Sequence, residues 1–168
     1  PAPGELVLTI DPKMSFGTGY HESTRLILGM VEQHVRAGMT VLDIGTGTGV
    51  VAIAALRLGA TSAVGCDIDE WSYTNAIENA ALNGVSGRIT ILHGDIAVTP
   101  ATPYDLVIAN IQRNVLIPLI PAMRSRLKPG GMLLLAGLLL TDREAMTEAL
   151  AQYGFSICDD RTENEWIA

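Results

Sequence analysis

Short apolar segments alternate with helix-like segments through most of the chain, and this alternation constrains the fold more than any other feature. Strands are expected at five of the apolar segments, residues 40–44, 63–66, 89–93, 106–109 and 132–136. Helices are expected around them, at residues 23–34, 50–58, 70–82, 115–127 and 141–153. Such alternation is typical of an α/β fold with a mostly parallel sheet and helices on both faces. Residues 155–158 and 166–168 predict two further strands, a C-terminal antiparallel hairpin that completes a seven-stranded sheet.

A glycine-rich segment, Asp43–Gly49, connects the first expected strand to the helix that follows it. Glycine is required where a chain turns sharply and where a ligand approaches the backbone closely. The second expected strand leads to Asp67, 22 positions after Gly45. A carboxylate at about this spacing binds ribose hydroxyls in nucleotide-binding folds, and the ligands of such folds lie beyond the carboxyl ends of the strands. The two features together predict a nucleotide cofactor.

The residues of the glycine-rich segment distinguish between kinds of cofactor. The dinucleotide fingerprint needs Gly or Ala at the position that Val50 occupies, which weakens a nicotinamide-dependent oxidoreductase as an alternative. A phosphate-binding Walker loop needs Gly-Lys-Ser/Thr, which the segment lacks. Asp43 is unfavourable beside a pyrophosphate but favourable beside a cation. S-adenosylmethionine carries a sulfonium and an ammonium group and no phosphate, so the acidic loop favours it.

The charge of the chain disfavours nucleic acid as a substrate. The net charge is −7, and the 11 basic residues are spread along the sequence apart from a short run over 124–128. Proteins that bind nucleic acid normally present a Lys/Arg-rich face to the phosphates, whereas an acidic surface suits a cationic partner such as a Lys-rich protein. The sequence has neither a leader pattern nor an apolar run of about 18 residues, so it predicts no membrane span and a cytoplasmic location.

Six motifs occur in order along nearly the whole chain: Asp11–Arg25, Asp43–Gly49, Gly65–Asp69, Asn79–Gly84, Ala109–Ile111 and Leu127–Gly131. On these motifs the sequence resembles the class I methyltransferases, and among them the bacterial enzymes that methylate lysines and the N-terminus of a ribosomal stalk-base protein. The resemblance implies a Rossmann-like fold and a single methyltransferase catalytic domain over 1–168. Residues 1–39 would form a loop and helix that cover the cofactor, and 40–168 the core. Members of that family also carry an N-terminal recognition domain, and we expect this chain to be a trimmed part of such a protein.

The resemblance also implies which residues contact S-adenosylmethionine. Those implied to bind the cofactor are Phe16, Thr18, Gly19, Thr24, Asp43, Gly45, Thr46, Gly47, Asp67, Ile68, Asp95 and Asn110. Among them, Asp95 stands where many class I enzymes hold the adenine amine. No metal is implied, and Cys66 and Cys158 lack the spacing of a metal or redox pair.

The segment after the fourth expected strand bears on the methyl acceptor. Methyltransferases that act on planar nitrogens often have Asn/Asp-Pro-Pro-Tyr there, whereas this chain has Asn110-Ile111-Gln112-Arg113. An aliphatic amine is therefore favoured over a base or an amide. We expect Asn110 to place the acceptor or the methionine end of the cofactor, and His21 or Tyr20 to close over the methyl group.

The favoured function is thus an enzyme that methylates an amine of a protein, such as a ribosomal protein. A small-molecule methyltransferase with the same pocket remains an alternative, because fold and cofactor site do not specify the acceptor. A non-catalytic cofactor-binding module that keeps the fold for docking or nucleotide sensing is a further alternative. Intact glycines at 45 and 47, together with Asp67 and Asn110, argue against it.

Overall fold

The structure, a computed structural model, describes residues 5–168. Helices and strands alternate along it, and the longer elements are α1 Glu22–His34, β1 Thr40–Ile44, α2 Val50–Arg57, β2 Ser62–Asp67, α3 Glu70–Leu82, β3 Ile89–His93, β4 Tyr104–Asn110, α4 Arg113–Ser125, β5 Leu127–Ala136 and α5 Arg143–Gln152. Shorter elements are the 3-10 turns η1 Ser86–Arg88, η2 Ile96–Val98 and η3 Leu140–Asp142, and the strands β6 Leu138–Leu139, β7 Thr162–Glu163 and β8 Trp166–Ile167. The expected α/β alternation is confirmed.

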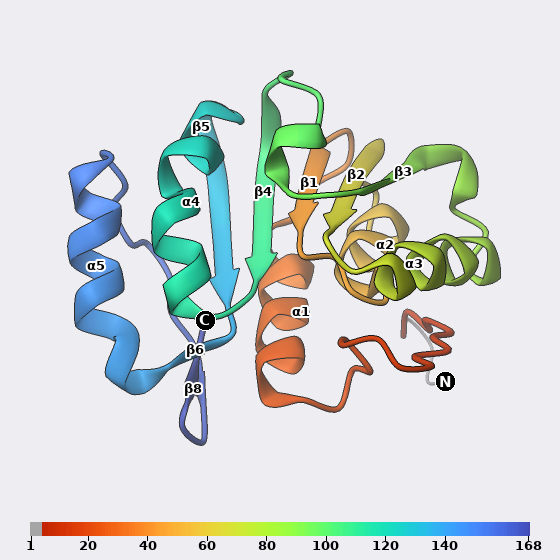
Figure 1. Cartoon of the computed structure of the whole chain (residues 1–168), viewed down its shortest axis with the longest axis horizontal. Helices are drawn as coiled ribbons and strands as arrows, with labels where there is room; N and C mark the ends of the chain where they lie inside the picture. Colours follow the sequence, from red (N-terminus) through yellow and green to blue (C-terminus); the bar gives the residue numbers. More distant parts are fainter. Residues whose placement is uncertain (1–4) are drawn as a thin grey trace.

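The five long strands form one sheet in the order β3-β2-β1-β4-β5, and each pair in it is parallel. Their carboxyl ends therefore lie along a single edge, toward which the arrows point in Figure 1. The strand order reverses between β1 and β4, and open α/β sheets bind ligands at this reversal. The N-terminal loop, residues 5–21, and the first residues of α1 lie at the same edge of the sheet (Figure 1).

Successive residues of the central strands pack on opposite faces of the sheet, as the pleat requires. Val41, Leu106 and Ile108 belong to a core cluster that includes buried residues of α1 and α2. Leu42 and Val107 belong to a second cluster with residues of α4 and α5. Because both faces are covered by helices, the middle of each strand is a continuous apolar run, Val41–Leu42 in β1 and Leu106–Ala109 in β4, rather than an alternating pattern.

The expectation of a seven-stranded sheet is wrong, because the main sheet has five strands. Residues 155–158 form no strand, and β8 pairs with β6 and β7 in a separate antiparallel sheet. The chain leaves the main sheet at Gly137, which has a φ of +78° and lies against Ile111. A Cβ at Gly137 would stand 2.9 Å from the backbone of Ile111, so this turn requires glycine.

An apolar groove of about 440 Å³ runs along the outer edge of β5. Its walls come from β5, α5 and residues 154–160, on the opposite side of the sheet from β3. Several boundaries also differ from expectation. The helix expected at 115–127 is α4, Arg113–Ser125, and β5 already begins at Leu127. The strands β2 and β4 extend beyond the expected 63–66 and 106–109, and α5 begins at Arg143 rather than 141. Within residues 5–168, no helix is both long enough and apolar enough to cross a membrane.

Candidate functional site

The glycine-rich segment turns from the end of β1 into α2 with three residues in the left-handed region. Gly45, Gly47 and Gly49 have φ values of +70°, +54° and +81°. At Gly47 space is also limiting, because a Cβ there would lie 2.4 Å from the carbonyl oxygen of Phe16. Glycine is therefore needed at 47 both for the conformation and for the close approach of the N-terminal loop. The structure thus brings together Phe16 and Gly47, two of the residues predicted to contact the cofactor.

Asp67, at the end of β2, directs its carboxylate at this loop. Its Oδ2 accepts a hydrogen bond from the amide of Gly47 at 2.8 Å, and its Oδ1 accepts one from the amide of Asp69 at 3.0 Å. A carboxylate has about four lone-pair sites, so both oxygens retain acceptor capacity for a ligand. Asp67 is half-buried, and its carboxylate lies at the carboxyl end of β2, beside the glycine-rich segment.

Asp43 lies beneath the loop rather than at its surface. Its side chain is buried, and Thr46 donates a hydrogen bond of 2.7 Å to its Oδ2. Burial disfavours the charged form and raises the pKa of this carboxyl from 3.8 to about 6, with a smaller contribution from the charge of Asp67. Asp43 and Thr46 thus hold the loop from inside.

The raised pKa of Asp43 makes the stability of the fold depend on pH. Between about pH 4 and pH 6 the folded protein keeps a proton that the unfolded chain has lost, so this group's contribution to stability decreases as pH rises. Over that window the unfolding free energy of the wild type should fall by about 3 kcal/mol relative to Asp43→Asn, which does not ionise. Urea titrations of both proteins between pH 4 and pH 7.5 measure this difference, and parallel pH curves would contradict it.

The N-terminal loop is hydrogen-bonded onto the glycine-rich segment through Thr48. The amide of Thr48 donates to the carbonyl of Phe16 at 2.9 Å, and its hydroxyl donates to the carbonyl of Gly17 at 2.8 Å. The carbonyl of Thr48 accepts in turn from Nδ2 of Asn79 at 3.0 Å. Thr48 therefore joins three segments, although the sequence analysis assigned it no role.

An asparagine ladder, made of Asn75 and Asn79 on α3 and Asn83 at its C-cap, holds residues 9–11 of the N-terminal segment. The amide groups of Thr9 and Asp11 donate to the side chains of Asn83 and Asn79, both at 2.9 Å. Their carbonyls accept from the ladder in return, from Asn83 at 2.7 Å and from Asn75 at 2.8 Å. The side chains thus pair with an extended segment as a neighbouring strand would. The sequence signal that could have indicated this ladder is the four-residue spacing of the three asparagines along and just after the predicted helix.

His21 is the N-cap of α1. Its Nδ1 accepts a hydrogen bond of 3.2 Å from the amide of Ser23, so the neutral ring carries its proton on Nε2. The ring lies edge-on to Phe16, with centroids 5.3 Å apart, and to Trp166 at 4.5 Å. The Nδ1 lone pair is occupied in this arrangement, and a role for His21 as a proton acceptor would require this cap to break.

Four buried side-chain atoms within residues 5–168 have no hydrogen-bond partner: Ser15 Oγ, Thr24 Oγ1, Tyr104 Oη and Asn110 Oδ1. Two of them belong to residues that the sequence analysis placed in the cofactor site. Thr24 is in the first turn of α1, and Asn110 ends β4 at the reversal of strand order. Buried polar atoms are nearly always hydrogen-bonded, so each of these two oxygens is free to accept a hydrogen bond from a ligand or from water.

The remaining predicted contacts, Ile68, Thr18, Gly19 and Asp95, are exposed or partly buried. Ile68 is 76% exposed after the end of β2, and Thr18 is exposed in the N-terminal loop, next to the partly buried Gly19. Asp95 is exposed beyond the end of β3, where its carboxylate accepts from the amide of Ala97 at 2.8 Å and caps η2. Its own turn is joined to β2 by a hydrogen bond from the amide of Gly94 to the carbonyl of Asp67, 2.8 Å long.

Comparisons with known proteins identify the family of the chain. The family model for ribosomal protein L11 methyltransferase (PrmA) matches residues 1–168. A ribosomal protein L11 methyltransferase of Lacticaseibacillus paracasei is 44% identical over 98% of this chain and 52% of its own length. One from Thermus thermophilus is 44% identical over 97% of this chain and 63% of its own. The chain thus spans between about half and two thirds of the length of these relatives.

Solved structures give the same result for the fold. The crystal structure of a ribosomal protein L11 methylase from Lactobacillus delbrueckii subsp. bulgaricus superposes with a TM-score of 0.89 and 34% identity, over 96% of this chain and 82% of that one. A SAM-dependent methyltransferase from Thiobacillus denitrificans, solved with S-adenosyl-L-homocysteine, gives a TM-score of 0.67 at 20% identity over 80% of this chain and 65% of that one, a likeness of fold alone. On sequence and on structure, this chain belongs to the ribosomal protein L11 methyltransferase family.

Proposed function

We propose that the protein is a methyltransferase that binds S-adenosylmethionine at the carboxyl ends of β1, β2 and β4. The observation that carries the proposal is the pair of buried, unpartnered oxygens, Thr24 Oγ1 and Asn110 Oδ1, in the elements around the glycine-rich segment. Polar atoms in such positions are satisfied by a ligand or by water. The turn at Gly47 and the carboxylate of Asp67 supply the remaining parts of a nucleoside site.

The chemistry of these residues fits this cofactor. The oxygens of Asp67 can accept hydrogen bonds from the two ribose hydroxyls while still accepting from the backbone. The segment 43–49 contains no lysine or arginine that would compensate a pyrophosphate, and the carboxylates of Asp43 and Asp67 favour a cationic ligand. We therefore assign the adenosyl end to Asp67, Ile68 and Asp95, and the methionine end to the glycine turns and Thr24.

When bound, S-adenosylmethionine supplies an electrophilic methyl group on a sulfonium. The protein must then hold an acceptor in line with that methyl group and exclude water from it. Asn110 Oδ1 can accept a hydrogen bond from an amine and so orient its nitrogen. The loop of Phe16–Gly19 would cover the pocket, and the ring of His21, held by its cap, would form part of the wall.

For the acceptor we propose an amine of a protein, and specifically of a ribosomal protein, as the names of the relatives suggest. The net charge of −7 suits a Lys-rich partner. A substrate of this kind also implies action in the cytoplasm. Because the chain spans only part of its relatives' length, we propose it as the catalytic domain. Residues 1–39, of which 1–4 lie outside the described part of the chain, would cover the cofactor, and 40–168 would form the core.

Calorimetry tests the proposal. We expect S-adenosylhomocysteine to bind with one site per chain and NAD not to bind. Incubation with radiolabelled S-adenosylmethionine and bacterial extract should then label the protein fraction. The absence of S-adenosylhomocysteine binding would contradict the methyltransferase class. Label in RNA or in small molecules would support a methyltransferase but contradict a protein as the methyl acceptor.

A further inference from the structure

Residues 16–20, which we call the flap, lie against the glycine-rich segment of the proposed site and are held at both ends. Its first end is fixed by the hydrogen bonds from Thr48 to Phe16 and Gly17. Between the ends, Gly19 has a φ of +88°, and the space where its Cβ would stand is open. The middle of the flap therefore has little packing of its own, and its position depends on the two attachments.

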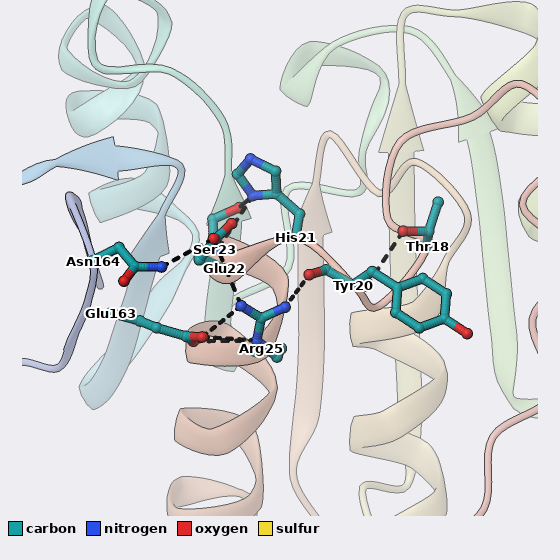
Figure 2. Close-up of polar contacts among 8 residues, drawn as sticks. All are labelled: Thr18, Tyr20, His21, Glu22, Ser23, Arg25, Glu163 and Asn164. Atoms are coloured by element: carbon teal, nitrogen blue, oxygen red, sulfur yellow. Dashed lines mark hydrogen bonds and ion pairs between the residues drawn. The ribbon is translucent and has the colours of Figure 1, made fainter.

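The second attachment is made by one side chain, Arg25, in the first turns of α1 (Figure 2). One terminal nitrogen, Nη1, donates to the carbonyl of Tyr20 at the far end of the flap. The Nε and Nη2 atoms donate to the carboxylate of Glu163 in β7, with Nε 3.0 Å from Oε1. The planar guanidinium thus joins the flap, α1 and the C-terminal hairpin β7–β8 at one point, a geometry that lysine does not reproduce.

The hairpin that carries Glu163 is itself fixed. Asn164, at its turn, donates to Oε1 of Glu22 at 3.2 Å, and Trp166 lies against the ring of His21. On its other side β8 pairs with β6, in register Leu139 to Trp166. Since β6 directly follows the turn at the end of β5, the hairpin connects the carboxyl edge of the main sheet to the start of α1.

From this arrangement we infer that Arg25 is a positioning residue for cofactor binding, and that the C-terminal hairpin acts on the cofactor through it. With Glu163 fixing its guanidinium, Arg25 holds the Tyr20 carbonyl, and with it the flap and the first turn of α1 where Thr24 lies. The inference rests on the proposed function, because it assigns the flap to the S-adenosylmethionine pocket.

An exposed ion pair contributes little to global stability. The Arg25–Glu163 pair is partly exposed, with side chains 43% and 35% accessible. Its loss should therefore change the order of the flap much more than the stability of the fold. This difference separates a positioning role from a merely structural one.

The first experiment compares Arg25→Ala with Arg143→Ala by calorimetry with S-adenosylhomocysteine. Arg143 forms an ion pair of similar exposure with Asp160, between α5 and the segment before β7, and so serves as a matched control. We expect Arg25→Ala to weaken binding about tenfold, which corresponds to about 1.4 kcal/mol, and Arg143→Ala to bind as the wild type does. The melting temperatures of the two variants should fall by similar small amounts.

A second measurement uses the ligand-free protein and needs no activity. Hydrogen–deuterium exchange of the peptide that covers residues 16–25 should be faster in Arg25→Ala than in the wild type, and unchanged in Arg143→Ala. The double variant Arg25→Glu with Glu163→Arg restores an ion pair, but a carboxylate at 25 has no proton to donate to Tyr20. We expect this variant to retain the weak binding and the fast exchange.

The outcomes distinguish the inference from the proposed function. If the wild type does not bind S-adenosylhomocysteine, both fail. If the wild type binds and Arg25→Ala binds equally well, the inference alone is overturned. Recovery of wild-type affinity in the double variant would overturn the role of the Tyr20 hydrogen bond, because the ion pair would then suffice.

Discussion

Replacing Asp67 with alanine should weaken the binding of S-adenosylhomocysteine at least a hundredfold, to the limit of calorimetric detection. The proposed site gives this carboxylate two ribose hydroxyls to accept from, and a hydrogen bond to a charged group contributes about 1.5–3 kcal/mol. The same change removes the acceptors of the Gly47 and Asp69 amides. The glycine turn therefore loses its hydrogen bond to β2, which holds its backbone in place for the ligand.

Two further variants separate these contributions. Asp69→Ser lies two residues away and keeps a good cap for α3, where Asp69 accepts from the amide of Ser72 at 2.8 Å. The affinity of this variant for S-adenosylhomocysteine should remain within about twofold of that of the wild type, a difference in binding free energy of about 0.4 kcal/mol. Asp67→Asn keeps one oxygen for Gly47 but removes the charge, so we expect an intermediate affinity. Wild-type binding by Asp67→Ala would exclude this carboxylate from the cofactor site.

Much of the fold could be predicted from the sequence because its signals are local. The bounds of β1, α3 and β3 match the predicted ranges 40–44, 70–82 and 89–93. Each of these elements is an apolar or helical run that stops at glycine, asparagine or a turn. The placement of Asp67 beside Gly47 also followed from the sequence, because parallel strands bring their carboxyl ends to one edge.

The features that depend on distant contacts could not be predicted in this way. Segments 155–158 and 166–168 have strand-like composition, but whether they join the main sheet is decided by the course of the chain after Gly137, where glycine lies against Ile111. Composition does not reveal this contact. The partners of the asparagine ladder lie 64 to 74 positions earlier in the chain, and the attachment of Arg25 to Glu163 spans 138 positions.

Asn110 and Asn79 are two asparagines in or beside the proposed site, with opposite hydrogen-bonding states. Asn79 is fully buried and satisfied, since its side chain accepts from Asp11 and donates to the carbonyl of Thr48. Asn110 has a buried Oδ1 with no partner within the described part of the chain. A residue that pairs with the protein supports the fold, whereas one kept unpaired has no stabilising contact to lose through that atom.

Asn110→Ala should therefore reduce methyl transfer about a hundredfold, the effect of losing one hydrogen bond of about 2–3 kcal/mol to a charged or reacting group, while the unfolding free energy changes by less than about 1 kcal/mol. Asn79→Ala should instead lower the unfolding free energy by about 2–4 kcal/mol, because the Asp11 amide and the Thr48 carbonyl are left without partners. Urea unfolding and a labelled-methyl assay on both variants measure the two effects. If Asn110→Ala were as destabilised as Asn79→Ala and its residual folded fraction fully active, Asn110 would be a structural residue and the unpaired oxygen would carry no function.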